Sequence, residues 1–452
     1  EKSKAVSVVS MQYPPCFLTI PPLWYSLGMD TKISVVEAGA IYKVGELFIE
    51  AFGHSSVLLV ADGNTMRAAG FETIRSLEKA GLVVRQLVFD AHPRPYADES
   101  TIARVRMTLA LDDSIAVVLA SGTLNDVTKR ASAELDRPYM VVGTAPSMDG
   151  YTSYGAAINF KGFKQTMACA APVVVVGDTN VLKEAPKEMI ASGFADCMAK
   201  FTAGMDWILA DLLGVHPIRR DVWDMVQIPL RRVYSQAEGV ASRTEGPITA
   251  LFEGLAASGY AMQVMEDSRP ASGAEHLISH VWEMEHLSVD GDEVSHGFKV
   301  AVGTVAIAHL YEELLRVDER EWYGNPEQSW QERERDIRSL FTDERIVNQT
   351  LTVARDKFLS GEALEARRSA LIALLPLLKE RIAEQMPPLD DLRSALKTVG
   401  APTTASQIGT DLRGLQRAVR GAQMIRNRYT VLDLYYELGL FDRAVSALEG
   451  LA

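Results

Sequence analysis

Short apolar runs alternate with segments of helical spacing through the first 180 or so residues, and this alternation strongly limits the possible folds. Continuous Val, Ile and Leu runs are typical of strands that are buried on both faces, as in parallel sheets covered by helices. We therefore predict an α/β amino-terminal part. Its apolar runs lie at 57–60, 82–89, 114–119 and 138–142, and the helical patterns between them lie at 66–80, 98–112 and 125–135.

The pattern changes near residue 180, where long helical segments replace the strand runs. Examples lie at 189–213, 276–287, 301–315 and 367–385. We predict an α/β domain over residues 1–182 and an all-α domain over residues 183–452. The charged stretch at 316–345 is interpreted as a solvated surface excursion.

Composition excludes several classes of protein. The 452 residues carry 59 acidic and 46 basic side chains, a net charge of -13 that disfavours binding to nucleic acid. The most apolar stretch, at 167–177, is too short to span a bilayer, and we expect neither a membrane span nor a signal peptide. Three cysteines (Cys16, Cys169 and Cys197) are too few for a disulfide framework, which favours a cytoplasmic protein.

Histidines gather in one part of the chain and suggest a metal site. His276 and His280 are four residues apart on a predicted helix and share a face, and His296 begins another helix. Asp196 lies in an apolar helix, where burial without a cation would be costly. One carboxylate with two or three imidazoles is typical of an open site for zinc or a similar divalent metal. Five of the eight histidines lie within 34 residues: His276, His280, His286, His296 and His309. The alternative is that they are unconnected helix residues, with His286 and His309 on the surface.

The segment 119–126 follows a predicted strand and opens a helix. Small residues at such a turn let a phosphate approach backbone N–H groups at the positive helix end. A tight turn in which Asn125 or Asp126 caps the helix explains the pattern equally well.

Two further positions lie where parallel strands end. The segment 144–153 is rich in hydroxyl groups and contains a single acid, Asp149, at a place where open α/β sheets bind ligands. Asp62 ends the strand at 57–60, where it could bond a ribose hydroxyl and repel a 2′-phosphate. An ordinary loop and a helix N-cap are the respective alternatives.

Five segments together resemble a known family. They resemble the sn-glycerol-1-phosphate dehydrogenases, particularly the bacterial type, which belong with the iron-type alcohol dehydrogenases, glycerol dehydrogenase and dehydroquinate synthase. The resemblance extends from about Val35 to about Leu432, and the fourth segment is its most specific element. The segments are Gly-Thr-Leu-Asn-Asp at 122–126, Thr-Ala-Pro-Ser-Met-Asp-Gly at 144–150, Gly-Phe-Ala-Asp at 193–196, Ser-Arg-Pro-Ala-Ser-Gly-Ala-Glu-His at 268–276 and Ser-His-Gly-Phe-Lys-Val at 295–300.

The resemblance implies a Rossmann-like domain beside a helical domain, with the active site in the cleft between them. It implies NAD, with NADP possible, and one divalent ion (zinc, nickel or iron) as cofactors. By position, the metal ligands would be Asp196, His276 and His296, and Asp149 and His280 would lie near the substrate. The phosphate loop would span Ala120 to Leu124, and cofactor contacts would come from Ser121, Gly122, Thr123, Leu124, Thr144, Ser147 and Ser153.

The implied reaction is the reversible NAD(P)H-linked reduction of dihydroxyacetone phosphate to sn-glycerol 1-phosphate. The metal would stabilise the alkoxide, His280 would relay a proton, and Asp149 would orient a substrate hydroxyl. Lys161, Lys164 and Arg269 are candidates for binding the substrate phosphate, and the alternative for each is a surface or structural charge. The alternatives are a related polyol or sugar-phosphate dehydrogenase, a cyclase of the dehydroquinate synthase type, which has Glu at the position of Asp196, and a non-catalytic descendant.

The chain departs from the resemblance at the phosphate loop. Archaeal members have three glycines there, whereas Ala120 and Ser121 precede Gly122 here, and a side chain at Ala120 could crowd the pyrophosphate. We also expect a homodimer or higher oligomer, for which helical faces around 432–440 could serve as the interface.

Overall fold

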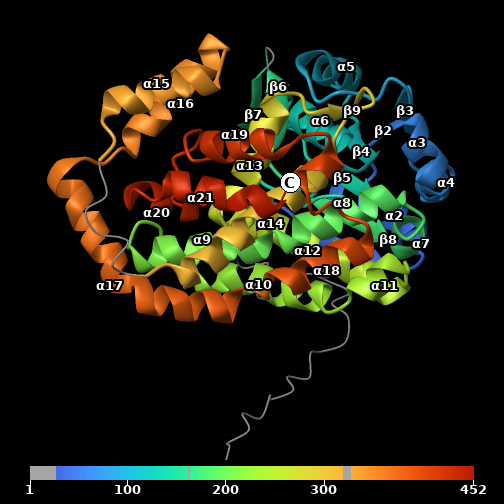
Figure 1. The fold of residues 1–452 in the computed structure, drawn as a ribbon. Coiled ribbons are helices and arrows are strands. Elements are labelled where there is room, and N and C mark those ends of the chain that lie inside the picture. Colours follow the sequence, from blue (N-terminus) through green and yellow to red (C-terminus); the bar gives the residue numbers. More distant parts are fainter. Residues whose placement is uncertain (1–26, 161–162, 319–326, 452) are drawn as a thin grey trace, which may run out of the picture.

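A six-stranded parallel sheet forms the centre of the amino-terminal half (Figure 1). The structure, a computed structural model, describes residues 27–160, 163–318 and 327–451, so Cys16 and Lys161 lie outside the described residues. The strand order is β1-β8-β5-β4-β2-β3. The strands are β1 (Ile33–Glu37), β2 (Val57–Asp62), β3 (Val84–Phe89), β4 (Ile115–Ala120), β5 (Tyr139–Gly143) and β8 (Val174–Asp178).

Helices cover both faces of this sheet, which explains the continuous apolar runs. Leu58 and Val60 of β2 pack on the side of α5 (Glu99–Leu109) and α6 (Gly122–Ala133). Leu59 and its alternate neighbours face α2 (Val44–Phe52) and α4 (Phe71–Lys79). Both sets of side chains are buried because successive residues of a strand point to opposite faces. The predicted α/β fold is confirmed, although the helix predicted at 66–80 is divided: α3 (Gly63–Thr65) leads into a π-helical turn at Met66–Gly70 before α4.

The strand order reverses direction between β2 and β4. From β2 the chain first adds β3 on one side and then returns to place β4 on the other side. In open α/β sheets, ligands bind at such a switch point, outside the carboxyl ends of the strands. Asp62 ends β2 and Ala120 ends β4, so both predicted cofactor segments lie at this edge.

A two-stranded antiparallel hairpin interrupts the path from β5 to β8, and the sequence patterns did not predict it. It consists of β6 (Ala156–Phe160) and β7 (Phe163–Met167). β6 packs on α5 and α6, while β7 contacts α13 (Ala274–Met284) of the helical half. The hairpin therefore connects the sheet to the helices that carry the histidines.

Among the described residues after β8, the regular elements are helices apart from the small hairpin of β9 (Ser288–Val289) and β10 (Asp292–Glu293). The predicted boundary at 182/183 falls between α7 (Thr179–Leu182) and α8, and the division into two domains stays a prediction. Within the described residues, no helix is both long and apolar enough to cross a membrane. The helices are α8 (Lys187–Met198), α9 (Lys200–Leu212), α10 (Arg220–Tyr234), α11 (Ala237–Ala241), α12 (Glu245–Met265), α13, α14 (His296–Arg316), α15 (Trp330–Leu340), α16 (Glu344–Asp356), α17 (Gly361–Gln385), α18 (Leu389–Val399), α19 (Leu412–Ala422), α20 (Val431–Glu437) and α21 (Phe441–Ser446).

Two surface expectations need correction. The charged stretch at 316–345 includes α15, whose outer side is exposed but whose Arg333 and Ile337 are buried against the rest of the molecule. The segment expected to offer an oligomer interface is buried within the chain: Leu432, Leu434 and Leu438 are all fully inaccessible. A repeating apolar pattern marks a buried helix face without saying whether the partner is the same chain or another. The homodimer or higher oligomer stays a prediction, but the segment at 432–440 is not its interface.

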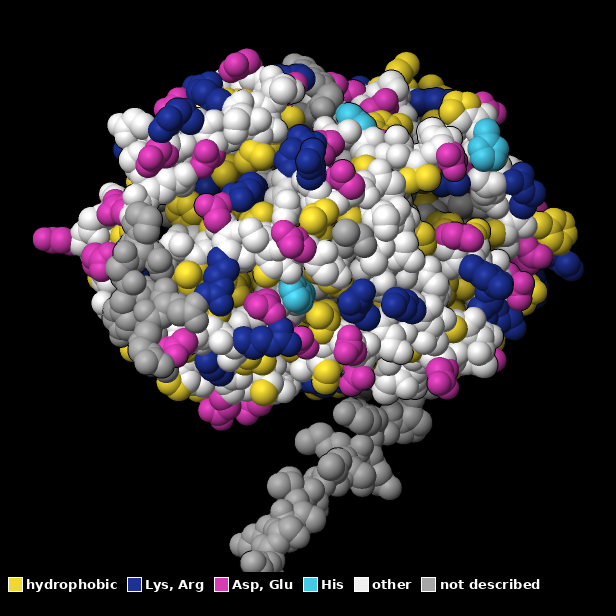
Figure 2. All heavy atoms as spheres, in the orientation of Figure 1, with side chains coloured by type: hydrophobic (Ala, Val, Ile, Leu, Met, Phe, Trp, Pro, Cys, Tyr) yellow, Lys and Arg dark blue, Asp and Glu magenta, His cyan; other side chains and the backbone are white. Residues whose placement is uncertain are grey.

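Acidic and basic side chains are interspersed over the face shown in Figure 2.

Candidate functional site

Asp196, His276 and His296 come from three different helices and meet at one point. Asp196 lies in α8, His276 in the first turn of α13, and His296 begins α14, whose N-cap Ser295 accepts a hydrogen bond from the Phe298 N–H. One potential ligand atom from each lies within 4.8 Å of the other two. Asp196 and His276 are buried, and His296 is half-buried.

Two glycines in the helices that carry these ligands allow close contacts with neighbouring backbone. A Cβ atom on Gly193 of α8 would collide with the backbone carbonyl of Pro146, and one on Gly297 of α14 would collide with that of Ser192. Both glycines are near neighbours of ligands, three residues before Asp196 and one after His296. The contact at Gly297 therefore sets how closely α14 approaches α8, and the contact at Gly193 sets how closely the loop at 144–153 approaches α8.

Buried carboxylates orient both imidazoles of the cluster. Glu275 Oε1 lies 2.8 Å from His276 Nδ1, and Glu283 Oε1 lies 2.8 Å from His296 Nδ1. Such partners fix the ring orientation and direct the other nitrogen, Nε2, toward an ion. Burial by itself would lower the pKa of His276, but hydrogen bonds to Asp196 and Glu275 raise it to about 9.

A buried lysine balances the acid of the cluster. Lys200 Nζ lies 2.6 Å from Asp196 Oδ1 and 2.7 Å from Asp149 Oδ2, and the Asp149 N–H donates to Asp196 Oδ2. Burial opposes ionisation of Asp196, but Lys200 and the neighbouring imidazoles lower its pKa. Lys200 was not among the predicted site residues, although its position four residues after Asp196 on an apolar helix is a recognisable signal.

The donor set fits a divalent ion. One carboxylate and two imidazoles with second-layer carboxylates are ligands that zinc, nickel and iron accept. The distance between ligand atoms leaves room for an ion between them. A bound ion would share Asp196 with the ammonium group of Lys200, since that group now contacts Oδ1.

The predicted phosphate loop lies at the N-terminus of the 12-residue helix α6. Its N-cap residue, Ser121, makes no side-chain cap. Of the two residues considered as caps, Asn125 donates to the Gly150 carbonyl and Asp126 Oδ2 accepts from the Ala157 N–H. Ser121 and Gly122 are half-buried, Thr123 is exposed and Leu124 is buried. Ala120, the last residue of β4, is buried and packs in the hydrophobic core.

The loop at 144–153 follows β5 at the carboxyl edge of the sheet, and hydrogen bonds from buried side chains hold it in place. Thr144, Ser147, Asp149 and Ser153 are all buried. Ser147 Oγ lies 3.1 Å from the Tyr151 hydroxyl group. A buried ammonium group that sequence analysis missed, Lys129 Nζ, donates to the Gly150, Ser153 and Gly155 carbonyls at 3.1, 2.9 and 2.9 Å.

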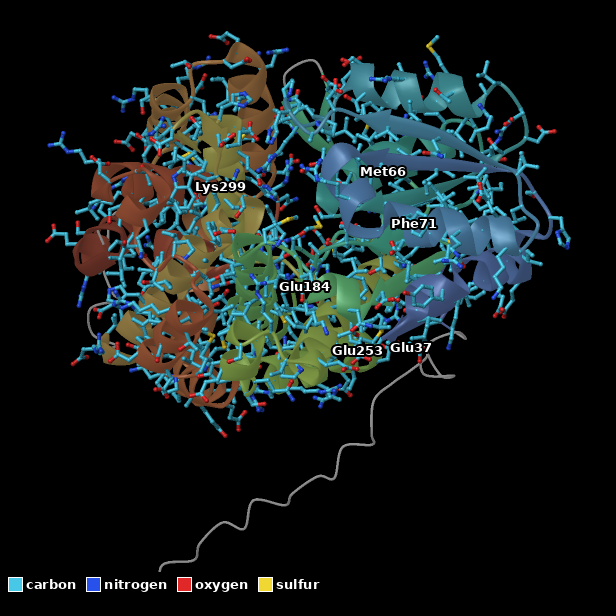
Figure 3. The ribbon with its side chains drawn as sticks, turned by 90° about the vertical axis from the view of Figure 1, so that its right-hand side faces the viewer. Glu37, Met66, Phe71, Glu184, Glu253 and Lys299 are labelled. Carbon is cyan, nitrogen blue, oxygen red and sulfur yellow. The ribbon has the colours of Figure 1, made fainter. Side chains whose placement is uncertain are left out.

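Asp62 acts as the N-cap of α3. Its Oδ1 accepts hydrogen bonds from the Asn64 and Thr65 N–H groups. This is the alternative considered for Asp62, and its contact with a ribose stays a prediction. Figure 3 shows this part of the sheet half, marked by Met66 and Phe71, opposite α14, marked by Lys299.

The remaining candidates have separate fates. His280 Nδ1 lies 3.0 Å from Glu283 Oε2, so one carboxylate holds both His280 and His296. His286 is exposed as expected, whereas His309 is half-buried and bonded to the Ala447 carbonyl. The guanidinium of Arg269 is buried and donates to the Tyr429 and Asp206 carbonyls, which makes it a structural residue rather than an open phosphate ligand. The side chain of Lys164 lies outside the described residues.

Solved structures share this architecture. A probable glycerol dehydrogenase from Sinorhizobium meliloti superposes with a TM-score of 0.60 at 14% identity, covering 92% of this chain and 97% of that chain. The NADH-dependent butanol dehydrogenase A of Thermotoga maritima gives a TM-score of 0.56 at 15% identity, with coverage of 92% and 97%. Residues 35–186 also match the family described as iron-containing alcohol dehydrogenase. The chain therefore shares its fold with these dehydrogenases, and its amino-terminal part matches the model of the iron-containing alcohol dehydrogenase family.

Sequence relatives narrow this class. The chain is 31% identical over 392 residues to glycerol-1-phosphate dehydrogenase [NAD(P)+] of Geobacillus stearothermophilus, covering 85% of this chain and 87% of the relative. It is 33% identical over 273 residues to the enzyme of that name from Bacillus subtilis, covering 60% and 69%. The chain belongs to the glycerol-1-phosphate dehydrogenase family.

Proposed function

We propose that this protein catalyses the reversible NAD(P)H-linked reduction of dihydroxyacetone phosphate to sn-glycerol 1-phosphate, with one divalent ion held by Asp196, His276 and His296. The observation that carries the proposal is the convergence of these three side chains beside the ligand-binding edge of the sheet. The names of the relatives support the substrate and the cofactor. The ligand types support zinc, nickel or iron as the ion.

The dinucleotide binds at the carboxyl edge of β2 and β4 in this proposal. Its pyrophosphate meets the backbone N–H groups of Ser121 to Leu124 at the start of α6, where the helix dipole favours negative charge. Thr144, Ser147 and Ser153 line the cofactor from the neighbouring loop. Asp62 bonds the ribose, which favours NADH because its carboxylate repels a 2′-phosphate.

His280 of the helical half supplies a proton, and Asp149 of the loop at 144–153 orients the substrate. When bound, the ion supplies Lewis acidity at the substrate's carbonyl oxygen. Glu283 holds the His280 ring through Nδ1, and we assign proton delivery to the oxygen atom to His280 Nε2. Asp149, which is fixed by Lys200 at 2.7 Å, orients the neighbouring substrate hydroxyl.

A substrate panel with a metal measurement on the same sample tests the proposal. The wild-type protein should oxidise NADH with dihydroxyacetone phosphate much faster than with dihydroxyacetone, and should contain about one ion per chain. His276→Ala should lose both the ion and turnover, whereas His286→Ala, at an exposed histidine, should retain both. Full activity and metal content in His276→Ala would contradict the ligand assignment. Turnover without net NADH oxidation would instead indicate a cyclase.

A further inference from the structure

A pocket beside His280 is formed where four parts of the chain meet. It encloses about 520 Å³, part of it open to solvent. The hairpin β6–β7 provides Thr166, α13 provides His280 and Glu283, α16 provides Thr350, and the segment after α19 provides Arg426. The pocket thus combines a cationic group and hydroxyl groups with the proposed proton donor.

Arg426 has no partner among the residues that the structure describes: none of them forms a hydrogen bond or ion pair with its guanidinium group. The side chain is half-buried, and burial together with the nearby Arg428 lowers its pKa. By contrast, Arg428 donates to the Ser272 carbonyl at 2.6 Å and pairs with Asp267 at 3.1 Å. An arginine removed in part from water is stabilised by an anion, and the pocket offers the space for one.

The pocket adjoins the proposed metal cluster. The ring centres of His280 and His296 are 6.5 Å apart, and Glu283 contacts both rings. Glu283 also borders the pocket, but both of its oxygens face imidazoles, and Lys299 Nζ lies 3.8 Å from Oε1. Its charge is therefore directed toward the cluster rather than left to repel an anion in the pocket.

We propose that Arg426 binds the phosphate group of the substrate in this pocket. The inference rests on the proposed function and adds the residue that recognises the phosphate. Three bonds separate phosphorus from the carbonyl carbon of dihydroxyacetone phosphate, so a phosphate on Arg426 places the carbonyl toward His280 and the ion. None of the residues that line the pocket comes from the loop at 120–124 or from the parallel sheet, so the pocket is separate from the proposed cofactor site.

Arg426→Gln tests this assignment, with Arg413→Gln as the matched control. Arg413 is exposed on α19, so the control removes the same charge nearby without touching the pocket. Loss of charge-assisted hydrogen bonds to phosphate should raise the KM for dihydroxyacetone phosphate about 10- to 150-fold. The kcat/KM for unphosphorylated dihydroxyacetone should remain within about twofold. An unchanged KM in Arg426→Gln, or an equal loss with both substrates, overturns the assignment.

Binding of inorganic phosphate provides a readout that does not depend on turnover. Phosphate should raise the melting temperature of the wild type and of Arg413→Gln but not of Arg426→Gln. If the wild type fails to reduce dihydroxyacetone phosphate, the proposed function fails, and this measurement still decides whether the pocket binds phosphate. Phosphate stabilisation that persists in Arg426→Gln overturns the inference.

A second variant keeps the test decisive if Arg426→Gln does not fold. Ile346→Glu adds a carboxylate to the α16 wall of the pocket, and Asn348→Glu adds one to the exposed side of the same helix. The first should raise the KM for dihydroxyacetone phosphate at least tenfold, while the second should leave it within about twofold. Equal KM values in these two variants overturn the inference.

Discussion

Replacement of Lys200 by methionine should destabilise the metal-free protein and make it more dependent on an ion. Lys200 is fully buried and lies 2.6 Å from Asp196 and 2.7 Å from Asp149, whose side chains are 0% and 11% exposed. Removing one partner of a buried pair leaves an uncompensated charge, which typically costs about 3–5 kcal/mol. Urea unfolding followed by tryptophan fluorescence in the presence of a chelator should show a loss of this size.

Added zinc should then restore part of the lost stability. An ion present at about 100 times its dissociation constant stabilises a folded protein by about 2.7 kcal/mol. In Lys200→Met the ion no longer shares Asp196 with an ammonium group, so it should bind more tightly and stabilise the variant more than the wild type. Lys187→Met, at an exposed lysine that begins α8, the helix that carries Asp196, is the control. A metal-free Lys200→Met protein that is as stable as this control would refute the role of Lys200 as the counter-ion.

Three further predictions concern the same sites. Because the pKa of His276 is raised to about 9, metal binding at pH 7 should release about one proton from this residue, and metal affinity should fall as the pH falls below 9. Calorimetry in two buffers of different ionisation enthalpy measures this proton release. If no proton is released, His276 is not protonated in the metal-free protein. Asp62→Asn should raise the kcat/KM for NADPH relative to the kcat/KM for NADH. The free energy of unfolding should change by less than about 0.5 kcal/mol, because asparagine caps helices equally well. If the relative kcat/KM values are unchanged, Asp62 has the capping role alone. Gly297→Ala should lower the metal content and the melting temperature. The control Gly246→Ala, whose added Cβ meets nothing within 4 Å, should stabilise the folded protein by up to about 1 kcal/mol. Equal effects of the two variants would show that the close contact at Gly297 is unimportant.

The parallel sheet could be predicted because its strands are buried on both faces. A strand such as β4, buried at every residue, cannot alternate apolar and polar side chains, so it appears as a continuous apolar run. The hairpin β6–β7 lacks this signal because residues such as Asn159 are only partly buried. The π-helical turn after α3 was missed because its local sequence has ordinary helical periodicity.

Residues of the candidate site were predictable where they form local motifs. Asp196, His276 and His296 were assigned through a resemblance, and the structure brings them within 4.8 Å. Their partners are harder to find because contacts such as that between Glu283 and His296 join residues 13 positions apart on different helices. Arg426 carries no local signal, since its significance lies in the pocket and in the lack of a partner among the described residues.

The glycine contacts beside the ligands have a consequence for how the site tolerates sequence change. At Gly193 and Gly297 the helices rest on backbone carbonyls, whose dimensions are the same whatever residues surround them. Substitutions in the surrounding core can therefore alter the stability of the fold while the spacing between the ligands stays constant. Divergent chains can in this way preserve an ion-binding geometry long after most of their interior side chains have been exchanged.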